Sequence, residues 1–160
     1  DRILDVGCGP GSMVPYLPKS EYVGFDANPD YIQQAQRRFP EAHFTCDQVN
    51  EYTLPQSEYF DIVIALGILH HLEDFEAVQL FRMARRTLKP DGRLITSDGV
   101  WLASQSKFAK FLLSRDRGRF VRQAEEYVAL ASTSFSSVSS AVRHDMLRIP
   151  YSHLILECRG

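Results

Sequence analysis

A strand-forming run that ends in a glycine cluster, ILDVGCGPGS at residues 3–12, constrains the fold of this chain more than any other stretch. Such a run is typical of an α/β sheet whose first strand leads into a nucleotide-binding loop. The glycines are spaced G-x-G-x-G, and Ser12 stands where a dinucleotide-binding loop would have its third glycine. Pro10 also removes one N–H group from the loop, so the pattern does not favour a pyrophosphate ligand.

The rest of the chain alternates stretches typical of strands and helices, which favours a parallel sheet with helices on both faces. Residues 60–66, FDIVIAL, form a nearly unbroken apolar run and predict a central strand that is covered on both sides. No internal repeat divides the chain, and we expect residues 1–160 to form a single domain. The other expected strands span residues 3–6, 22–25, 43–46, 93–97, 138–144 and 151–158, and a further helix spans residues 124–132.

Two more helices are predicted from their boundary residues and their apolar spacing. Asn28 is a suitable N-cap, Pro29 suits the first helical position, and Pro40 would end this first helix. A longer helix is expected to begin at Asp74 and to end at a turn predicted for KPDG, residues 89–92. Its expected core-facing stripe comprises Phe75, Val78, Phe81, Ala84 and Leu88.

Three carboxylates stand at the ends of three consecutive predicted strands, beside the glycine loop. Asp5 lies two residues before Gly7, where its charge would repel a pyrophosphate and attract a cation. Asp26 stands about where a dinucleotide-binding fold places the acid for ribose hydroxyls. Asp47 stands where a carboxylate can accept from an adenine amino group, although a turn residue would occupy the same position. The set predicts a nucleoside ligand that is positively charged and carries no phosphate, which S-adenosylmethionine matches.

Five stretches resemble class I S-adenosylmethionine-dependent methyltransferases of the broad small-molecule type: ILDVGCGPG, YVGFDAN, FTCDQV, YFDIVIALGILHHLED and TLKPDGRLI. The resemblance covers nearly the whole chain. It implies a three-layer, Rossmann-like α/β fold with a doubly wound, mostly parallel sheet of seven strands. The last strand would be antiparallel and inserted beside the strand before it. S-adenosylmethionine would be the cofactor, and its methyl group would pass to a small-molecule acceptor by direct displacement.

The resemblance also implies which residues bind the cofactor. This set comprises Asp5, Gly7, Cys8, Gly9, Gly11, Asp26, Ala27, Asp47, Gln48, Leu66 and Gly67. The methionine end of the cofactor would lie against Asp5 and the loop glycines, and Asp26 would bind the ribose. Asp47 and Gln48 would bind adenine, and the last two residues of the set would line the pocket wall. Ala27 stands where many members of the family have a polar residue that supports the cofactor.

His70 and His71 follow the central strand, in a stretch that faces both cofactor and acceptor in the family that the chain resembles. Imidazole titrates near neutral pH, so His70 is the candidate catalytic residue, as a general base. Alternatively, His70 caps or packs within the fold, His71 points elsewhere, and holding donor and acceptor in line supplies the acceleration without a base. No third ligand stands at helical spacing from the two adjacent histidines, so no metal site is expected.

Residues 101–122 interrupt the alternation of strands and helices and form a candidate acceptor-binding or lid insert. Its large apolar residues are Trp101, Phe108, Phe111 and Leu112, and its arginines are Arg115, Arg117, Arg119 and Arg122. The apolar group would either cover the acceptor or pack into the core, and the arginines would either bind an anionic group of the acceptor or stay solvated. Lys107 and Lys110 also allow weak contact with a membrane surface or a lipid substrate.

The leading interpretation is therefore a methyltransferase whose small-molecule acceptor reacts at oxygen, nitrogen or carbon. One alternative is a non-catalytic domain that binds S-adenosylmethionine or serves as a partner subunit. The other is a nucleic-acid methyltransferase. The net charge of −2 gives no basic field for nucleic acid, and the central strand is followed by no NPPY-type tetrapeptide of the nucleic-acid and protein enzymes.

The cysteines indicate the compartment. Cys8, Cys46 and Cys158 are an odd and widely spaced set, which favours a reducing environment, and no apolar run approaches the roughly 20 residues of a membrane span. We therefore expect a cytoplasmic protein. The chain opens on Asp1 and enters a strand at once, so we also expect residues upstream of it. In the family that the chain resembles, a helix before this strand often covers the cofactor.

Overall fold

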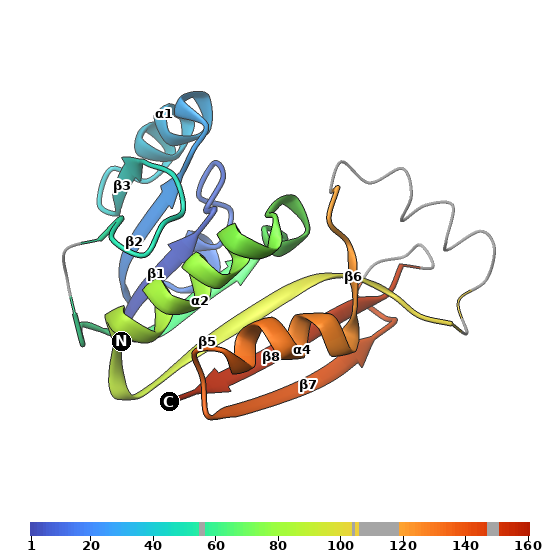
Figure 1. Cartoon of the computed structure of the whole chain (residues 1–160). Coiled ribbons are helices and arrows are strands. Elements are labelled where there is room, and N and C mark those ends of the chain that lie inside the picture. Colours follow the sequence, from blue (N-terminus) through green and yellow to red (C-terminus); the bar gives the residue numbers. More distant parts are fainter. Residues whose placement is uncertain (55–56, 104, 106–118, 147–150) are drawn as a thin grey trace.

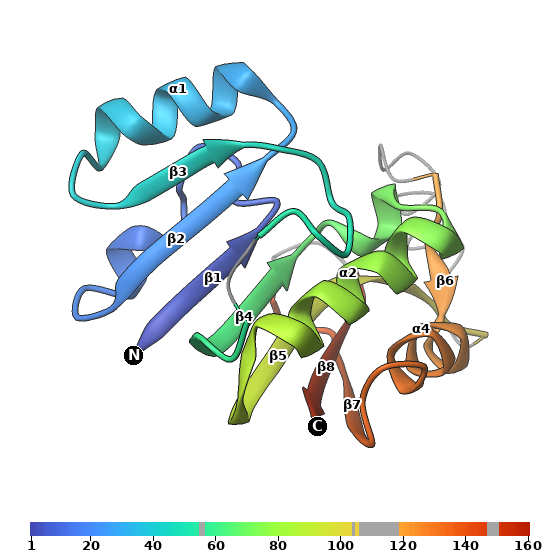
Figure 2. The same cartoon turned by 60° about the vertical axis from the view of Figure 1, so that its left-hand side comes forward.

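The computed structural model describes residues 1–54, 57–103, 105, 119–146 and 151–160. The strands are β1 (Arg2–Val6), β2 (Glu21–Asp26), β3 (His43–Cys46), β4 (Phe60–Leu66), β5 (Leu88–Trp101), β6 (Arg122–Gln123), β7 (Ser137–Arg143) and β8 (His153–Arg159). They form one twisted sheet, with α1 (Pro29–Arg38) on one face and α2 (Asp74–Thr87) and α4 (Ala124–Ser132) on the other (Figure 1; Figure 2).

The sheet order is β3-β2-β1-β4-β5-β8-β7, and the short β6 pairs with β5 beside this path. The first five strands run parallel, whereas β8 lies antiparallel between β5 and β7. This topology confirms the expected three-layer, doubly wound sheet with an antiparallel last strand. The two-residue β6 was not expected as a strand, and it closes the candidate insert 101–122, most of which lies outside the described residues.

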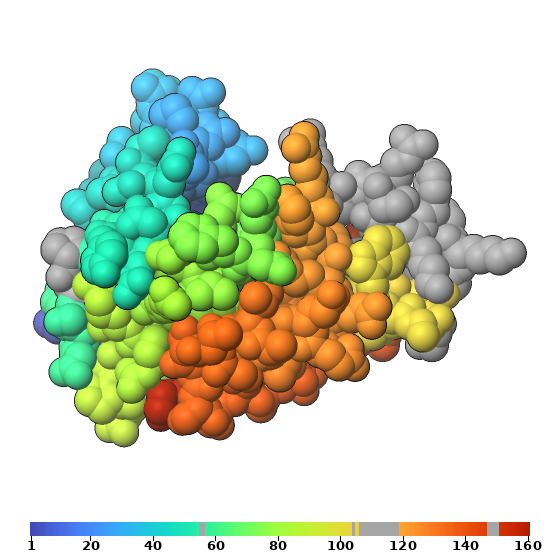
Figure 3. Space-filling model, in the orientation of Figure 1, coloured from blue at the N-terminus to red at the C-terminus, as the bar shows by residue number. Residues whose placement is uncertain are grey.

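Alternation along β2 shows how the two faces are filled. Tyr22 packs with Phe44 on the face that α1 covers, whereas Phe25 points to the opposite face and joins the larger core under α2 and α4. Figure 3 shows the outer side of the layer formed by α2 and α4. There the segment before β4, residues 47–54, forms one continuous surface with these two helices. Packing on both faces therefore holds β2 in position, with its carboxyl end at the edge of the sheet where the other parallel strands also end.

The core-facing stripe predicted for α2 is partly wrong. The helix begins at Asp74 as expected, and Glu73 and Glu76 close its first turn as a capping box. Its buried residues are Ala77, Leu80, Phe81, Met83, Ala84 and Thr87. Phe75 is 73% exposed, because it lies two residues before Ala77 and so projects from the other side of the helix. One face of a helix recurs every three to four residues, as the buried positions from Ala77 onward do. The predicted stripe instead advances by three residues at each of its first three steps, and its first residue therefore lies off the buried face.

The turn predicted for residues 89–92 lies inside β5. Leu88 already pairs with Phe60, and the next pair joins Arg93 to Ile62, so the intervening residues form an irregularity in the strand. Lys89 is held at this point by Asp61, with 2.5 Å between Nζ and Oδ1. The chain therefore passes from α2 directly into the sheet.

Two glycines of the loop after β1 provide a matched pair of stability variants. Both have positive φ, 53° at Gly9 and 75° at Gly11. A Cβ at Gly11 would meet Phe39 and Phe44 at 3.0–3.2 Å, whereas a Cβ at Gly9 would meet nothing within 4 Å. We expect Gly9→Ala to lower the free energy of unfolding by about 1 kcal/mol, and Gly11→Ala to lower it by ~1–3 kcal/mol more. Urea unfolding measures both, and equal losses would contradict the packing role of Gly11.

Candidate functional site

The glycine loop, residues 7–11, leaves β1 at the carboxyl edge of the sheet. Its glycines have φ of 72°, 53° and 75°, in the left-handed region that favours glycine. The N–H groups of Gly7 and Cys8 both donate to the carbonyl of Phe25, at 2.9 and 3.0 Å, and tie the loop to β2. At Gly9 the backbone borders open space, so a ligand can approach it closely.

Asp26 ends β2 and faces the glycine loop. Its Oδ2 accepts from the N–H of Gly9 at 3.0 Å, and its Oδ1 accepts from the N–H of Asn28 at 2.8 Å. Asn28 is also the N-cap of α1, so the carboxylate lies where the loop meets the helix. Because a carboxylate has about four acceptor positions, it can still accept hydrogen bonds from two hydroxyl groups of a ligand.

A cavity of about 600 Å³ lies between this loop, the end of β2 and the turn after β4. The predicted site residues that line it are Gly7, Gly9, Asp26, Ala27, Asp47, Gln48 and Gly67. Three carboxylates line it, those of Asp26, Asp47 and Glu76, and no lysine or arginine is among the described lining residues. The cavity therefore has the size of a small-molecule site and the charge of a site for a cation or a neutral ligand.

Five predicted site residues lie outside this lining: Asp5, Cys8, Gly11, Leu66 and His70. Asp5 is buried below the loop, where its carboxylate accepts a hydrogen bond from the hydroxyl of Tyr22. Burial raises the pKa of Asp5 to about 6, the Tyr22 hydrogen bond opposes this shift, and the charge of Asp26 adds to it. Cys8 belongs to the cluster under α1, and burial raises the pKa of its thiol to about 12.

His70 lies beside the cavity and is paired with a buried carboxylate from β5. Its Nδ1 is 2.7 Å from Oδ1 of Asp98, and its backbone N–H donates to the same oxygen at 3.2 Å. Asp98 is only 1% exposed, and burial raises the pKa of its carboxyl. The imidazole lies close to the cavity wall. Gly67 lines the cavity, and a Cβ atom placed on Gly67 would lie 3.8 Å from Cε1 of His70. In this arrangement a proton on Nδ1 is held by the carboxylate of Asp98, and Nε2 lies on the other side of the ring.

His71 lines the cavity, so the alternative that it points elsewhere is wrong. The lining residues that were not predicted as site residues are His71, Phe25, Tyr31, Val49, Ile68, Leu72 and Glu76. His71 belongs to the histidine turn, a 3₁₀ turn at Leu69–His71, and the turn places His71 on the cavity and His70 on Asp98. Tyr31 could have been found, because it lies in the first turn of the helix that Asn28 caps, directly after Asp26. No sequence signal showed which histidine would face the cavity.

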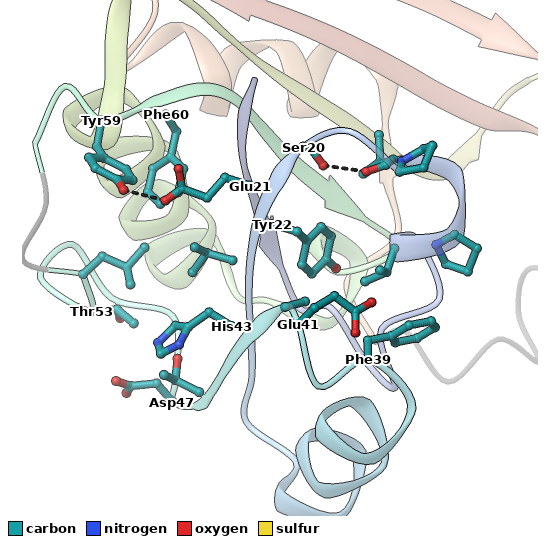
Figure 4. A pocket seen from close by; sticks show the side chains of 18 residues that line it. Ser20, Glu21, Tyr22, Phe39, Glu41, His43, Asp47, Thr53, Tyr59 and Phe60 are labelled. Carbon is teal, nitrogen blue, oxygen red and sulfur yellow. Dashed lines mark hydrogen bonds between the residues drawn. The ribbon is translucent and has the colours of Figure 1, made fainter.

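A second cavity of about 730 Å³ surrounds the edge of the sheet at β2 and β3 (Figure 4). Its lining residues come from both sides of these strands: Tyr22 and Phe39 lie on one side, and Tyr59 and Phe60 on the other. Two of its polar groups are hydrogen-bonded to other lining residues: the Tyr59 hydroxyl donates to Glu21 at 2.6 Å, and the Ser20 hydroxyl donates to the carbonyl of Leu17 at 2.8 Å. This larger cavity therefore borders the edge strand β3, and Asp47 lines both it and the glycine-loop cavity.

Two further properties bear on the chemistry of the site. Within the described ranges, no group of three or more His, Cys, Asp or Glu side chains could hold a metal ion. None of the helices that the structure describes is both long enough and apolar enough to cross a membrane.

Comparison with known proteins identifies relatives of the chain. A family model described as a methyltransferase domain matches residues 3–92. A ubiquinone biosynthesis O-methyltransferase of Azorhizobium caulinodans is 36% identical over 60% of this chain and 39% of its own length. The 27-O-demethylrifamycin SV methyltransferase of Amycolatopsis mediterranei is 34% identical over 65% of this chain and 40% of its own length. The chain thus spans about two fifths of the length of these curated relatives.

Solved structures share the fold at lower sequence identity. An S-adenosylmethionine-dependent methyltransferase from Methanosarcina mazei superposes with a TM-score of 0.79 at 19% identity, over 99% of this chain and 92% of that chain. A geranyl diphosphate C-methyltransferase from Streptomyces coelicolor, solved with S-adenosyl-L-homocysteine, superposes with a TM-score of 0.75 at 15% identity, over 99% and 73%. The fold of the described residues is therefore that of these enzymes.

The raised pKa of Asp5 predicts a pH-dependent stability difference. Folding raises the pKa of Asp5 from 3.8 to about 6, so its ionised carboxylate destabilises the folded state. This loss of stability is absent below pH 3.8 and complete above about pH 6. Asp5→Asn lacks this penalty. We therefore expect the variant to gain stability relative to the unmodified chain as the pH rises through this window, by about 2–3 kcal/mol in total.

Urea unfolding of both proteins at a series of pH values measures this difference. Tyr22→Phe serves as the companion variant, because it removes the hydrogen bond that lowers the pKa of Asp5 and so should enlarge the penalty. Unfolding free energies that stay parallel for the unmodified chain and Asp5→Asn across the window would contradict this account.

Proposed function

The chain belongs to the methyltransferase domain family, and from this premise we propose that it binds S-adenosylmethionine in the glycine-loop cavity and methylates a small molecule. The observation that carries this proposal is the lining of the cavity, which combines three carboxylates and an open glycine backbone with no described lysine or arginine. Such a lining disfavours a pyrophosphate and favours a nucleoside with positive charge. The named O-methyltransferases among the relatives support a small-molecule acceptor.

The residues around the cavity suit the parts of this cofactor. Asp26 would accept from the ribose hydroxyls, and Asp47 with Gln48 would bind the adenine edge. The methionine end would lie along the backbone of the glycine loop, above the buried carboxylate of Asp5. When bound, the cofactor supplies a methyl group on a positively charged sulfur.

His70 is the proposed general base for the acceptor. Its pairing with Asp98 supports this role, because the carboxylate fixes the imidazole tautomer and stabilises the imidazolium that forms when a proton is taken up. Nε2 would accept the proton of an acceptor hydroxyl, whose oxygen would form the new bond to the methyl carbon while the bond from that carbon to sulfur breaks and its electron pair stays on the sulfur. A hydroxyl needs such a base more than a neutral amine does, because a hydroxyl oxygen is a weak nucleophile until it loses its proton. The geometry therefore favours oxygen as the reacting atom.

The free cysteines support a reducing compartment such as the cytoplasm. Cys8 and Cys158 are buried, Cys46 is exposed, and all three are free cysteines. Burial raises the pKa of Cys158 to about 12, so this side chain packs as an inert apolar group.

Calorimetry tests the cofactor. We expect S-adenosylmethionine and S-adenosylhomocysteine to bind, and NAD not to bind. Asp26→Ala should weaken binding by roughly one to three decades, because two charge-assisted hydrogen bonds to the ribose are lost. Asp30→Ala is the matched control, since Asp30 is an exposed acid on the first turn of α1 and lies outside the cavity lining. Binding of NAD without S-adenosylmethionine would overturn the proposal.

The reaction is tested with simple phenols and the corresponding anilines as probe acceptors, by following formation of S-adenosylhomocysteine. We expect turnover with the phenols, and we expect His70→Gln to lower it by about 10²–10⁴-fold while cofactor affinity changes little. Cofactor binding with no turnover on either series, or turnover on anilines that survives His70→Gln, would refute the proposed base and acceptor atom.

A further inference from the structure

Arg122 is a buried arginine whose five N–H donors are all used. Nε and Nη2 donate to Oδ1 of Asp74, at 2.9 and 2.7 Å. Nη1 donates to the carbonyls of Leu69 and Phe120, at 2.9 and 3.1 Å, and Nη2 also donates to the carbonyl of Leu72 at 2.7 Å. The side chain is 7% exposed, so this guanidinium is neither solvated nor able to reach an acceptor's anionic group.

The acceptors of Arg122 surround one short piece of backbone. Leu69 begins the histidine turn and Leu72 directly follows it, so two hydrogen bonds hold both ends of the turn. Asp74 begins α2, so the ion pair also fixes the helix that continues from the turn. The guanidinium therefore sets the spacing between the end of the turn and the start of the helix.

The segment that carries Arg122 also holds His70 itself. The N–H of Phe120 donates to the carbonyl of His70 at 3.0 Å. From the other side, Asp98 accepts from the backbone N–H and from Nδ1 of the same residue. His70 is thus held on one side by β5 and on the other by the residues that enter β6.

We propose that Arg122 is a positioning residue for methyl transfer, which holds the histidine turn so that His71 stays on the cavity and His70 stays on Asp98. The inference rests on the proposed role of His70 and extends it to a residue that touches neither ligand. Only arginine suits this position, because its planar fork presents five donors in fixed directions, whereas lysine has three on a flexible stem. The turn carries Leu72 as well, so a displaced turn would also reshape the cavity wall.

A double-mutant cycle tests the proposal, with phenol turnover and the unfolding temperature measured for Arg122→Gln, His70→Gln and the double variant. If Arg122 acts through His70, Arg122→Gln lowers turnover by about 10- to 100-fold in the unmodified chain and has little further effect when His70 is already replaced. Arg122→Lys restores only a part of the loss. Equal effects in both backgrounds would overturn the proposal and leave Arg122 as a stabilising residue alone.

Arg86→Gln is the matched control. The Arg86 guanidinium also donates to backbone carbonyls, those of Glu51 and Leu54, but it does so in the segment before β4. We expect this variant to lose stability without the His70-dependent loss of turnover. Should Arg122→Gln fail to fold, Asp74→Asn removes only the charge of the exposed partner and should show a smaller loss of the same kind.

A spectroscopic readout separates this inference from the proposed reaction. The Nδ1–H proton of His70, bound to Asp98, should give a downfield resonance in the proton NMR spectrum of the unmodified chain. We expect Arg122→Gln to shift or broaden it and Arg86→Gln to leave it in place. If the resonance responds in this way while His70→Gln leaves turnover unchanged, Arg122 holds the histidine turn in place, but the general base fails and with it the action of Arg122 on turnover through His70. An unchanged resonance in Arg122→Gln would overturn the positioning role.

Discussion

The parallel register of β1 with its two neighbours is the constraint on which the site depends. Asp5 pairs with Gly24 of β2 and with Ile64 of β4, so the three strands reach their carboxyl ends at one edge. The glycine loop, Asp26 and the turn after β4 then meet there without any long loop having to fold back. A slip of one residue would turn Asp26 to the opposite face and separate it from Gly9, because side chains alternate along a strand.

The sequence was most informative where local chemistry and position agree. The bounds of β3, β4 and α4 were predicted to the residue, since apolar runs and boundary residues mark them clearly. The prediction for Phe75 was wrong because a three-residue spacing was taken for the buried stripe of a helix. The turn predicted for residues 89–92 was wrong because turn-forming residues can also form an irregular part of a strand. In the site, the acids at the strand ends were predicted from the sequence. The burial of Asp5 under the glycine loop was not, because burial depends on tertiary packing, and only the structure places Asp5 against Tyr22.

Short 3₁₀ turns and buried arginines lie beyond this kind of prediction. The histidine turn is too short for an apolar period to show which side chain faces the cavity, so His70 and His71 could not be told apart. Arg122 was grouped with three other arginines that follow one another in a polar stretch, and its burial arises from carbonyls some 50 residues earlier in the chain. Only a folded backbone brings those acceptors around one guanidinium.

The charge balance of the site ties the donor's chemistry to the fold. The charge of Asp26 adds to the rise that burial causes in the pKa of Asp5, so the two carboxylates repel each other when both are ionised. A ligand with a positive sulfur and an ammonium group would relieve this repulsion and would be favoured over a neutral nucleoside of the same shape. Methyl transfer leaves that sulfur neutral, so the product would lose one of the two attractions that held the substrate. On the proposed function, the acids that recruit the donor would therefore weaken the hold on the spent cofactor, and release would follow from the same charges that drove binding.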